Sequence, residues 1–386
     1  MKLKRFFLPT VAAIAAMTFA VACGDDEPVN PPGPDDPDVV DLSKGEDTPY
    51  GVLVGDIYYI VEGDEAIINK AKTTITTAKL PKKAKSDGET YPITKIAKDA
   101  FRGCTSLASV TIPAGVKSIG ESAFFGCGSL AEITVPYTVD EIGKQAFMGC
   151  VKLESFEFPS SIKKIDDYCF YSCSGLTTVV WPKNLEEIGD KAFSDCGLKQ
   201  LSLPTTVKKI GNSAFNGSKL EYASLPSSVT SFGEKMFMNC YSLKSINLPN
   251  GMKTIPKDFL GYCTKLEGID IPSSVTVIED YAFQWCQALD DLYVPANVTK
   301  ICGSAFQAYS GKRIKIGKSI QIIESYAFTN SYSIKEFYIY AQNPPTVGTE
   351  FCEPKLKERC TLYVPKGRLS AYSSWKNYFY AVKEME

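Results

Sequence analysis

The chain has 386 residues and a formal net charge of −2, because 42 lysine and arginine residues are set against 44 aspartate and glutamate residues. This balance shows no basic excess, so we do not expect nucleic acid as a partner. The chain contains no histidine, which removes the commonest general base, the usual base of a catalytic triad and the commonest zinc ligand. No nucleophile motif or phosphate-binding loop takes its place. We therefore expect a protein without enzymatic activity, metal or cofactor.

The first 22 residues have the pattern of a signal peptide. A basic start, MKLKR, precedes an apolar stretch at residues 6–22 that ends in small side chains. Cys23 follows at once, and the junction resembles the lipobox of bacterial lipoproteins, in which signal peptidase cuts before a cysteine that then carries a lipid. The resemblance implies that Cys23 is lipidated and anchors the chain to a membrane. Ala20 departs from that family, which usually has leucine there, and an ordinary secretory signal is the alternative.

Residues 23–50 are predicted to form a linker. The first part, residues 24–38, is rich in aspartate and proline and has no aromatic side chain, so it cannot bury a core and should act as an extended spacer. The acidic run after Cys23 resembles the signal that sends lipoproteins of some anaerobic Gram-negative bacteria to the outer face of the outer membrane. That resemblance implies export through the Sec pathway and a lipid-anchored position facing the cell exterior. A solvated linker without a sorting role is the alternative.

A phrase of about 23 residues recurs along most of the chain. Its clearest copy begins at Ala100 with AFRGCTSLASVTIP, and the copies are 22 to 24 residues apart when they are aligned on the phenylalanine. The aligned positions are Phe101, Phe124, Phe147, Phe170, Phe193, Phe215, Phe237, Phe259, Phe283, Phe306 and Phe328. So regular a period predicts a solenoid, in which each coil buries its apolar face only against its neighbours.

Each copy also predicts the course of one coil. In residues 107–112 apolar and polar side chains alternate, which indicates a short strand with one buried face. Pro113 should end this strand because proline has no amide hydrogen to offer to a ladder. Val116 and Ile119 form a second apolar pair, and Gly120 should allow a turn before a short helical Ala-Phe step. The expected fold is a stack of about eleven coils made mostly of short strands.

The pattern A-F-x-x-C-x-x-L-x-x-V-x-I-P…V-x-x-I-G resembles the BspA-type leucine-rich repeat, a class common in bacterial cell-surface proteins. The resemblance covers residues 96–340 and implies a leucine-rich repeat solenoid, although the best-known leucine-rich pattern has asparagine or cysteine where this chain has proline. Residues 51–95 resemble the β-rich N-terminal capping segment of that class, and residues 341–386 resemble its C-terminal cap. One coil, residues 314–323, is irregular and marks either a bend or a tolerated defect.

Eight cysteines recur in register with the repeat, at Cys104, Cys127, Cys150, Cys173, Cys196, Cys240, Cys263 and Cys286. Their spacing is that of the repeat itself, Ser218 and Ser331 replace two further members, and no C-x-x-C pair with partners occurs. We expect small buried side chains in the core rather than a metal or redox ladder. Cys352 and Cys360, in the C-terminal cap, are better candidates for a disulfide, and the sequence leaves that pairing open.

The outward residues of the first predicted strand are small and polar over most of the repeats. Towards the C-terminal end they become acidic and aromatic, at Asp270, Asp291, Tyr293, Glu336 and Tyr338. Tyrosine is enriched at binding surfaces because it offers a large contact area at low entropic cost. These residues are the predicted ligand-binding positions, and an ordinary half-exposed sheet face is the alternative.

These observations favour a non-catalytic lipoprotein of the cell surface whose solenoid binds a macromolecule. The family resemblance implies adhesion to proteins of a host or of neighbouring microbes. The main alternative is a structural component of the cell envelope that contacts glycan. An enzyme is the remote alternative.

Overall fold

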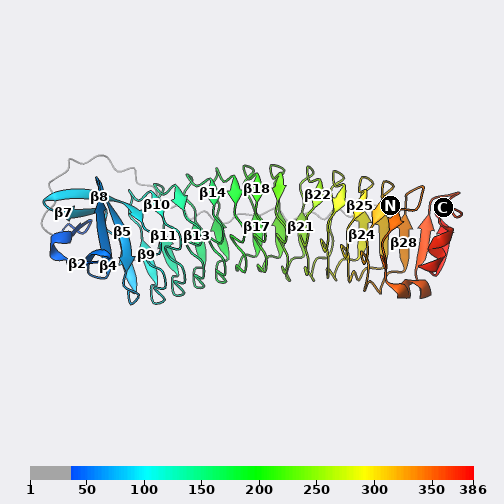
Figure 1. Ribbon diagram of the computed structural model, residues 1–386, viewed down its shortest axis with the longest axis horizontal. Coiled ribbons are helices and arrows are strands. Elements are labelled where there is room, and N and C mark those ends of the chain that lie inside the picture. Colours follow the sequence, from blue (N-terminus) through cyan, green and yellow to red (C-terminus); the bar gives the residue numbers. More distant parts are fainter. Residues whose placement is uncertain (1–35) are drawn as a thin grey trace, which may run out of the picture. The chain divides into compact units, whose positions relative to one another are not determined.

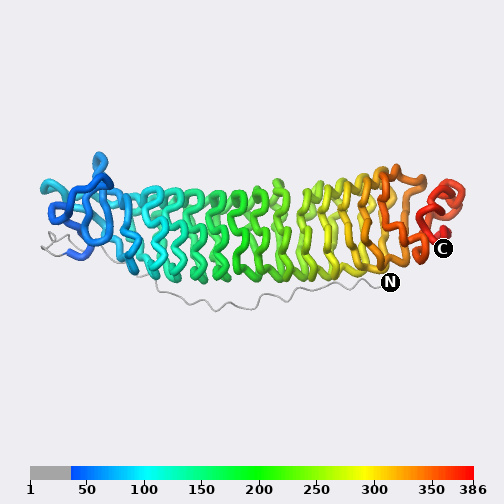
Figure 2. Tube along the Cα trace, turned by 60° about the horizontal axis from the view of Figure 1, so that its bottom comes forward, coloured from blue at the N-terminus to red at the C-terminus, as the bar shows by residue number. Residues whose placement is uncertain are grey.

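The computed structural model describes residues 36–386, and residues 37–386 form one unit. The predicted signal peptide, Cys23 and the first part of the acidic linker lie outside the described residues. In this unit the chain winds into coils that follow one another along one axis, as Figures 1 and 2 show. The predicted solenoid is therefore confirmed. Within the described part of the chain, no helix has the length and apolar character needed to cross a membrane.

The N-terminal segment is a mixed β-sheet that leads into the coils. Its elements are β1 (Val39–Asp41), the 3-10 helix η1 (Leu42–Lys44), β2 (Glu46–Thr48), β3 (Gly51–Val54), β4 (Ile57–Glu62), β5 (Glu65–Ala71), β6 (Thr77–Lys79), β7 (Lys83–Ser86) and β8 (Glu89–Ile96). Strand β6 pairs with the first repeat strand of one ladder, and β8 pairs with the first repeat strand of the other. The two ladders of the solenoid therefore begin inside the segment expected to cap it.

The first ladder contains the strand predicted before each proline. Its further members are β9 (Ser109–Thr111), β11 (Glu132–Thr134), β13 (Ser155–Glu157), β15 (Thr178–Val180), β17 (Gln200–Ser202), β19 (Tyr222–Ser224), β21 (Ser245–Asn247), β24 (Asp291–Val294), β26 (Arg313–Ile316), β28 (Glu336–Ile339), β30 (Thr361–Val364) and β31 (Ala381–Glu384). Paired strands are parallel and in register, so that Val110 lies opposite Ile133. The apolar side chains thus point into the core, and their polar neighbours point outward.

The second ladder is made of the Val–Ile edge of each coil. It comprises β10 (Ser118–Ile119), β12 (Glu141–Ile142), β14 (Lys164–Ile165), β16 (Glu187–Ile188), β18 (Lys209–Ile210), β20 (Ser231–Phe232), β22 (Thr254–Ile255), β23 (Val277–Ile278), β25 (Lys300–Ile301), β27 (Ile322–Ile323) and β29 (Thr346–Val347). These pairs are parallel as well, for example Ile119 with Ile142.

The repeated phenylalanines stack on one another in the core between the two ladders. From Phe101 to Phe237 and again from Phe283 to Phe328, neighbouring ring centroids are 5.0–5.8 Å apart with nearly parallel planes. The spacing is close to the distance between adjacent strands of a sheet, so each coil adds one ring to the stack.

The alignment on Phe259 is wrong by one residue. Leu260 occupies the phenylalanine position of its coil, since its carbonyl oxygen accepts a hydrogen bond from the Cys286 thiol, as the phenylalanine carbonyls do for the cysteines of other coils. Phe259 takes the neighbouring alanine position, and its ring meets Phe237 edge-on. Both residues are fully buried. The sequence carried the signal for the correct register, because Cys263 lies three residues after Leu260, as in the A-F-x-x-C pattern of the other coils.

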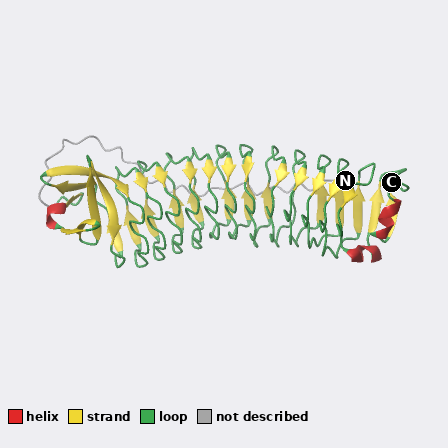
Figure 3. Ribbon diagram, viewed as in Figure 1, coloured by secondary structure: helices red, strands yellow, loops and turns green. Residues whose placement is uncertain are grey.

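The turn between the ladders differs from the prediction in two ways. Each coil has bends and turns where a short helix was expected, and within the described residues the helical segments are η1, η2 (Pro354–Glu358) and η3 (Ser373–Asn377), as Figure 3 shows. Residues with a left-handed backbone conformation lie two positions before and two positions after the repeated phenylalanine. Asp99 and Gly103 have this conformation on the two sides of Phe101. Gly120 is needed for the close packing of neighbouring coils. A Cβ atom at this position would lie 2.6 Å from the backbone nitrogen of Lys98 in the preceding coil.

The irregular coil keeps its place in the stack. Strand β26 pairs in register with both β24 and β28. Tyr309 fills the space of the missing cysteine, and its hydroxyl donates to the carbonyl oxygen of Arg313. Gly317 stands where most other coils have proline. A Cβ atom at this position would lie 2.4 Å from the Ala296 Cα atom, so the local backbone has room only for glycine. The irregularity is thus a local accommodation within the sheet formed by β24, β26, β28, β30 and β31.

The first ladder continues to the C-terminal end. Strand β30 pairs with β28, and β31 pairs with β30. Helix η3 places Trp375 against the core, and the buried Tyr372 beside it donates a hydrogen bond to the carbonyl oxygen of Ala341 at 2.9 Å. The last coils are therefore closed by aromatic side chains.

Candidate interaction surface

The predicted binding positions near the C-terminal end lie mostly on one sheet, formed by β24, β26, β28, β30 and β31. We name its outward side the C-terminal face. It carries two rows of side chains, each running across the strands. The first row is Asp291, Arg313, Glu336, Thr361 and Ala381, and the second is Tyr293, Lys315, Tyr338, Tyr363 and Lys383.

Arg313 joins the two acidic residues of the first row. Its Nε donates to Glu336 Oε2 at 2.6 Å, and its Nη1 donates to Asp291 Oδ2 at 3.0 Å. The hydrogen bond that the guanidinium donates to Glu336 raises the pKa of Arg313. The expected acidic strip is therefore largely neutralised by a basic residue in the irregular coil. Such partly exposed pairs contribute little to stability, but they hold the side chains in fixed positions.

The second row is aromatic and basic. The rings of Tyr338 and Tyr363 stack with centroids 4.5 Å apart. Lys315, on the other side of Tyr338, places its Nζ 5.7 Å from the centre of that ring. Tyr293 at the start of the row is 53% exposed. The row is thus a set of partly or largely exposed amphipathic side chains.

Asp270 does not belong to this sheet. No strand forms at residues 267–271, and β24 does not pair with any strand of the preceding coil. The strip expected to be continuous is therefore interrupted between Asp270 and Asp291, while Asp291, Tyr293, Glu336 and Tyr338 share the C-terminal face.

Among the members of this surface that sequence reasoning missed are Arg313, Lys315 and Tyr363. The first two lie 22 residues after Asp291 and Tyr293, which is the length of one coil. That spacing was a usable signal, but Gly317 and Tyr309 obscure the motif of their coil. Tyr363 was assigned to the C-terminal cap, although its strand continues the ladder.

The in-register cysteines are buried free thiols. Most of them donate a hydrogen bond to the carbonyl oxygen of the core residue in the preceding coil, as Cys127 does to Phe101 at 3.1 Å. Burial raises the pKa of Cys104 to about 11 and of Cys127 to about 12. The expected core role is confirmed by this placement. Cys352 and Cys360 are also buried free thiols in the structure.

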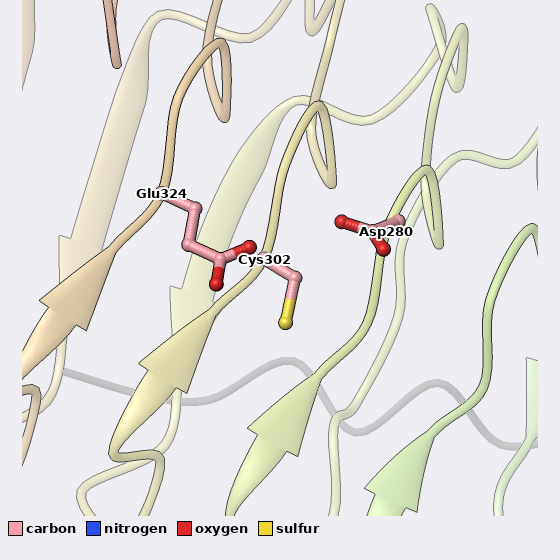
Figure 4. A group of neighbouring side chains, drawn as sticks. All are labelled: Asp280, Cys302 and Glu324. Carbon is pink, nitrogen blue, oxygen red and sulfur yellow. The ribbon is translucent and has the colours of Figure 1, made fainter. Parts of the chain in front are cut away.

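A different group of potential ligands follows three neighbouring strands of the second ladder. Asp280 follows β23, Cys302 follows β25 and Glu324 follows β27, and one ligand atom of each lies within 4.8 Å of the others. Figure 4 shows Cys302 on the coil between the two acidic residues. A shallow groove of about 470 Å³ between Tyr281 and Tyr326 reaches Glu324 from solvent. The sequence analysis did not identify this group.

The fold and its surfaces define a leucine-rich repeat solenoid. A family model described as the BspA type leucine rich repeat region matches residues 94–221 and 208–335. These matches cover more than half of the chain, so the chain belongs to the BspA-type leucine-rich repeat family. The resemblance proposed from the sequence is confirmed.

Solved structures of bacterial proteins share the fold. A leucine-rich repeat protein from Bacteroides ovatus is 20% identical, with 86% of this chain and 99% of that chain covered and a TM-score of 0.50. A leucine rich cell surface protein from Faecalibacterium prausnitzii is 22% identical, with 88% and 96% covered and a TM-score of 0.52. The pneumococcal vaccine antigen PcpA is 21% identical, with 86% and 98% covered and a TM-score of 0.56. No curated protein matches the chain.

Proposed function

We propose that this protein is a non-catalytic lipoprotein of the bacterial cell surface and that its C-terminal face binds another protein. The single observation that carries the binding proposal is the row formed by Tyr293, Lys315, Tyr338 and Tyr363 on one rigid sheet. Tyrosines held by neighbouring side chains lose little entropy on binding and are frequent at the centres of protein interfaces. A scaffold that presents an extended surface is also the usual role of repeat solenoids.

The arrangement of the aromatic rings favours a protein over a glycan. A sugar ring usually binds by lying flat on an open aromatic face. Tyr363 lies against one face of Tyr338, and Lys315 lies on the side of the opposite face. Tyr338 and Tyr363 are partly exposed, and their amphipathic side chains suit the mixed polar and apolar contacts of a protein interface.

The binding proposal is tested with biotinylated protein on arrays of extracellular proteins and of glycans. We expect a protein ligand whose affinity falls at least tenfold in the variant Tyr293→Ala/Tyr338→Ala, since interface tyrosines often contribute more than about 1.4 kcal/mol each. The matched control is Tyr222→Ala, which removes an exposed tyrosine from β19 on the same ladder. Equal loss in the control, or unchanged binding in the double variant, contradicts the assigned face. Ligands found only among glycans support the envelope role instead.

The cell-surface proposal rests on the apolar segment at residues 6–22, on Cys23 and on the acidic linker. The similar protein from F. prausnitzii is described as a cell surface protein, which agrees with this proposal. Protease treatment of intact cells should cleave the native chain, whereas Cys23→Ala should be released or lost. Protection of the native chain until the outer membrane is breached would place it in the periplasm and favour a scaffold role in the envelope.

A further inference from the structure

We propose that Asp280, Cys302 and Glu324 form a binding site for a zinc ion, with one thiolate and two carboxylate ligands and a water at the fourth position. This inference is independent of the proposed binding to a protein. It rests on the exceptional surroundings of Cys302, on the local charge and on the access to solvent.

Cys302 differs from the in-register cysteines of the repeats. Their thiols donate to backbone carbonyl oxygens, whereas Cys302 Sγ has no hydrogen-bond partner among the described residues. The side chain is only 7% exposed, so water is not a general substitute. A buried thiol that lies beside two carboxylates instead of a carbonyl oxygen is better placed to bind a cation than to fill a core.

The two carboxylates converge on one backbone group. Asp280 Oδ1 and Glu324 Oε2 both accept from the Gly303 amide, at 2.8 and 3.1 Å. Elsewhere on this edge the arrangement is simpler, because the Asp190 amide donates to Asp167 alone at 2.9 Å. One carboxylate is therefore enough to accept from the Gly303 amide, and the other remains available to a ligand.

The charges around the group leave an excess of negative charge. Glu324 pairs with Lys300 at 2.6 Å. Asp280 has no ion-pair partner among the described residues. Glu279 adds a third carboxylate near Cys302, and its Oε2 accepts a hydrogen bond from the Lys257 amide. A bound divalent cation would offset this charge, and deprotonation of Cys302 would accompany binding.

The ligand set selects the metal. Zinc accepts thiolate and carboxylate together, while calcium and magnesium prefer oxygen ligands alone. Ligand atoms around a tetrahedral zinc ion are about 3.3–3.8 Å apart, so the group must contract slightly from its present separation of up to 4.8 Å. Asp280 and Glu324 are both partly exposed and have room to move. The groove beside Glu324 provides the path of entry.

The test uses the purified protein with Zn²⁺ alone, and with Co²⁺ as a spectroscopic substitute. We expect one site with a thiolate-to-cobalt charge-transfer band, which Cys302→Ser abolishes. The variants Asp280→Asn and Glu324→Gln should each weaken Zn²⁺ binding about tenfold or more. Cys286→Ser is the matched control, because it removes a buried thiol that is already bonded to the Leu260 carbonyl oxygen, and it should leave the band unchanged.

Lys300→Met separates loss of a ligand from loss of fold. Removal of the competing ammonium group should strengthen Zn²⁺ binding several-fold, and partial unfolding would not produce this gain. Absence of the band at millimolar Co²⁺, an undiminished band in Cys302→Ser, or weaker binding in Lys300→Met would each overturn the assignment.

Discussion

The thiol of Cys127 donates a hydrogen bond to the carbonyl oxygen of Phe101 across the boundary between two coils, at 3.1 Å. The same bond links Cys150 to Phe124 and Cys173 to Phe147. The cysteines thus add a second donor, from the next coil, to a buried carbonyl that already accepts from a backbone amide of its own coil, as Phe101 does from Cys104. At one of the two serine positions the role is retained, since the Ser331 hydroxyl donates to Phe306.

Replacement of this donor should separate its polar role from its volume. We expect Cys127→Val to destabilise the protein by about 0.5–1.5 kcal/mol, because the Phe101 carbonyl oxygen loses its donor from the next coil and keeps only the Cys104 amide, and Cys127→Ser to cost less. Urea unfolding followed by circular dichroism measures the difference in midpoint. An equal loss in both variants would show that the thiol contributes only by packing.

The buried thiols should make the fold sensitive to alkali. Burial raises the pKa of Cys127 from 9.0 to about 12, so the folded state keeps its proton where the unfolded state loses it. The associated stability is present below about pH 9 and is lost as the pH rises towards 12, with a slope of about 1.4 kcal/mol per pH unit for each such thiol.

Urea midpoints measured from pH 8 to pH 11 test this dependence. Cys127→Ser should show a shallower fall than the native chain, because it lacks one of the titrating groups. A thiol reagent at pH 8 should leave Cys127 unmodified until the protein is unfolded. Rapid modification of Cys127 in the folded protein would contradict the burial of the ladder.

The close approach of neighbouring coils should be intolerant of added volume. Gly120→Ala places a Cβ atom 2.6 Å from the backbone nitrogen of Lys98. We expect the free energy of unfolding to fall by about 1–3 kcal/mol. Gly251→Ala is the matched control, because a Cβ atom there meets nothing within 4 Å. Thermal unfolding of the two variants should show a lowered midpoint for the first alone.

The corrected register predicts a coupled pair of substitutions. Phe259→Ala alone should cost about 3–5 kcal/mol because it leaves a cavity, and Leu260→Phe alone should cost about 1–3 kcal/mol because it overfills the stack. The double variant restores the Ala-Phe step of the other coils, so it should be more stable than Phe259→Ala. Additive losses in the double-mutant cycle would refute the assigned register.

The repeat architecture could be predicted because it depends on local patterns. The period of the phenylalanines and the alternation around Val110 each follow from residues close together in the chain. The function of Gly120 could not be predicted in this way, because its reason lies in the preceding coil. The register of Leu260, by contrast, could have been predicted from Cys263, which lies three residues later as the A-F-x-x-C pattern requires.

The candidate sites were predicted only in part for the same reason. Asp291 and Tyr293 follow the repeat and were found, whereas Arg313 lies in a coil whose motif is obscured. The group around Cys302 was missed because its members occupy slightly different positions of three coils, 22 residues apart. A search for polar residues one coil length apart would have found both.

The in-register pairing of successive coils, such as Ile119 with Ile142, has a consequence for how this protein can evolve. A coil from the middle of the stack offers the same edges to its neighbours as the coil beside it. Unequal recombination between the repeated segments of the gene can therefore insert or remove a whole coil without exposing the core. Each such event would change the length of the stack by about 4.8 Å, while both ends and the C-terminal face keep their structure.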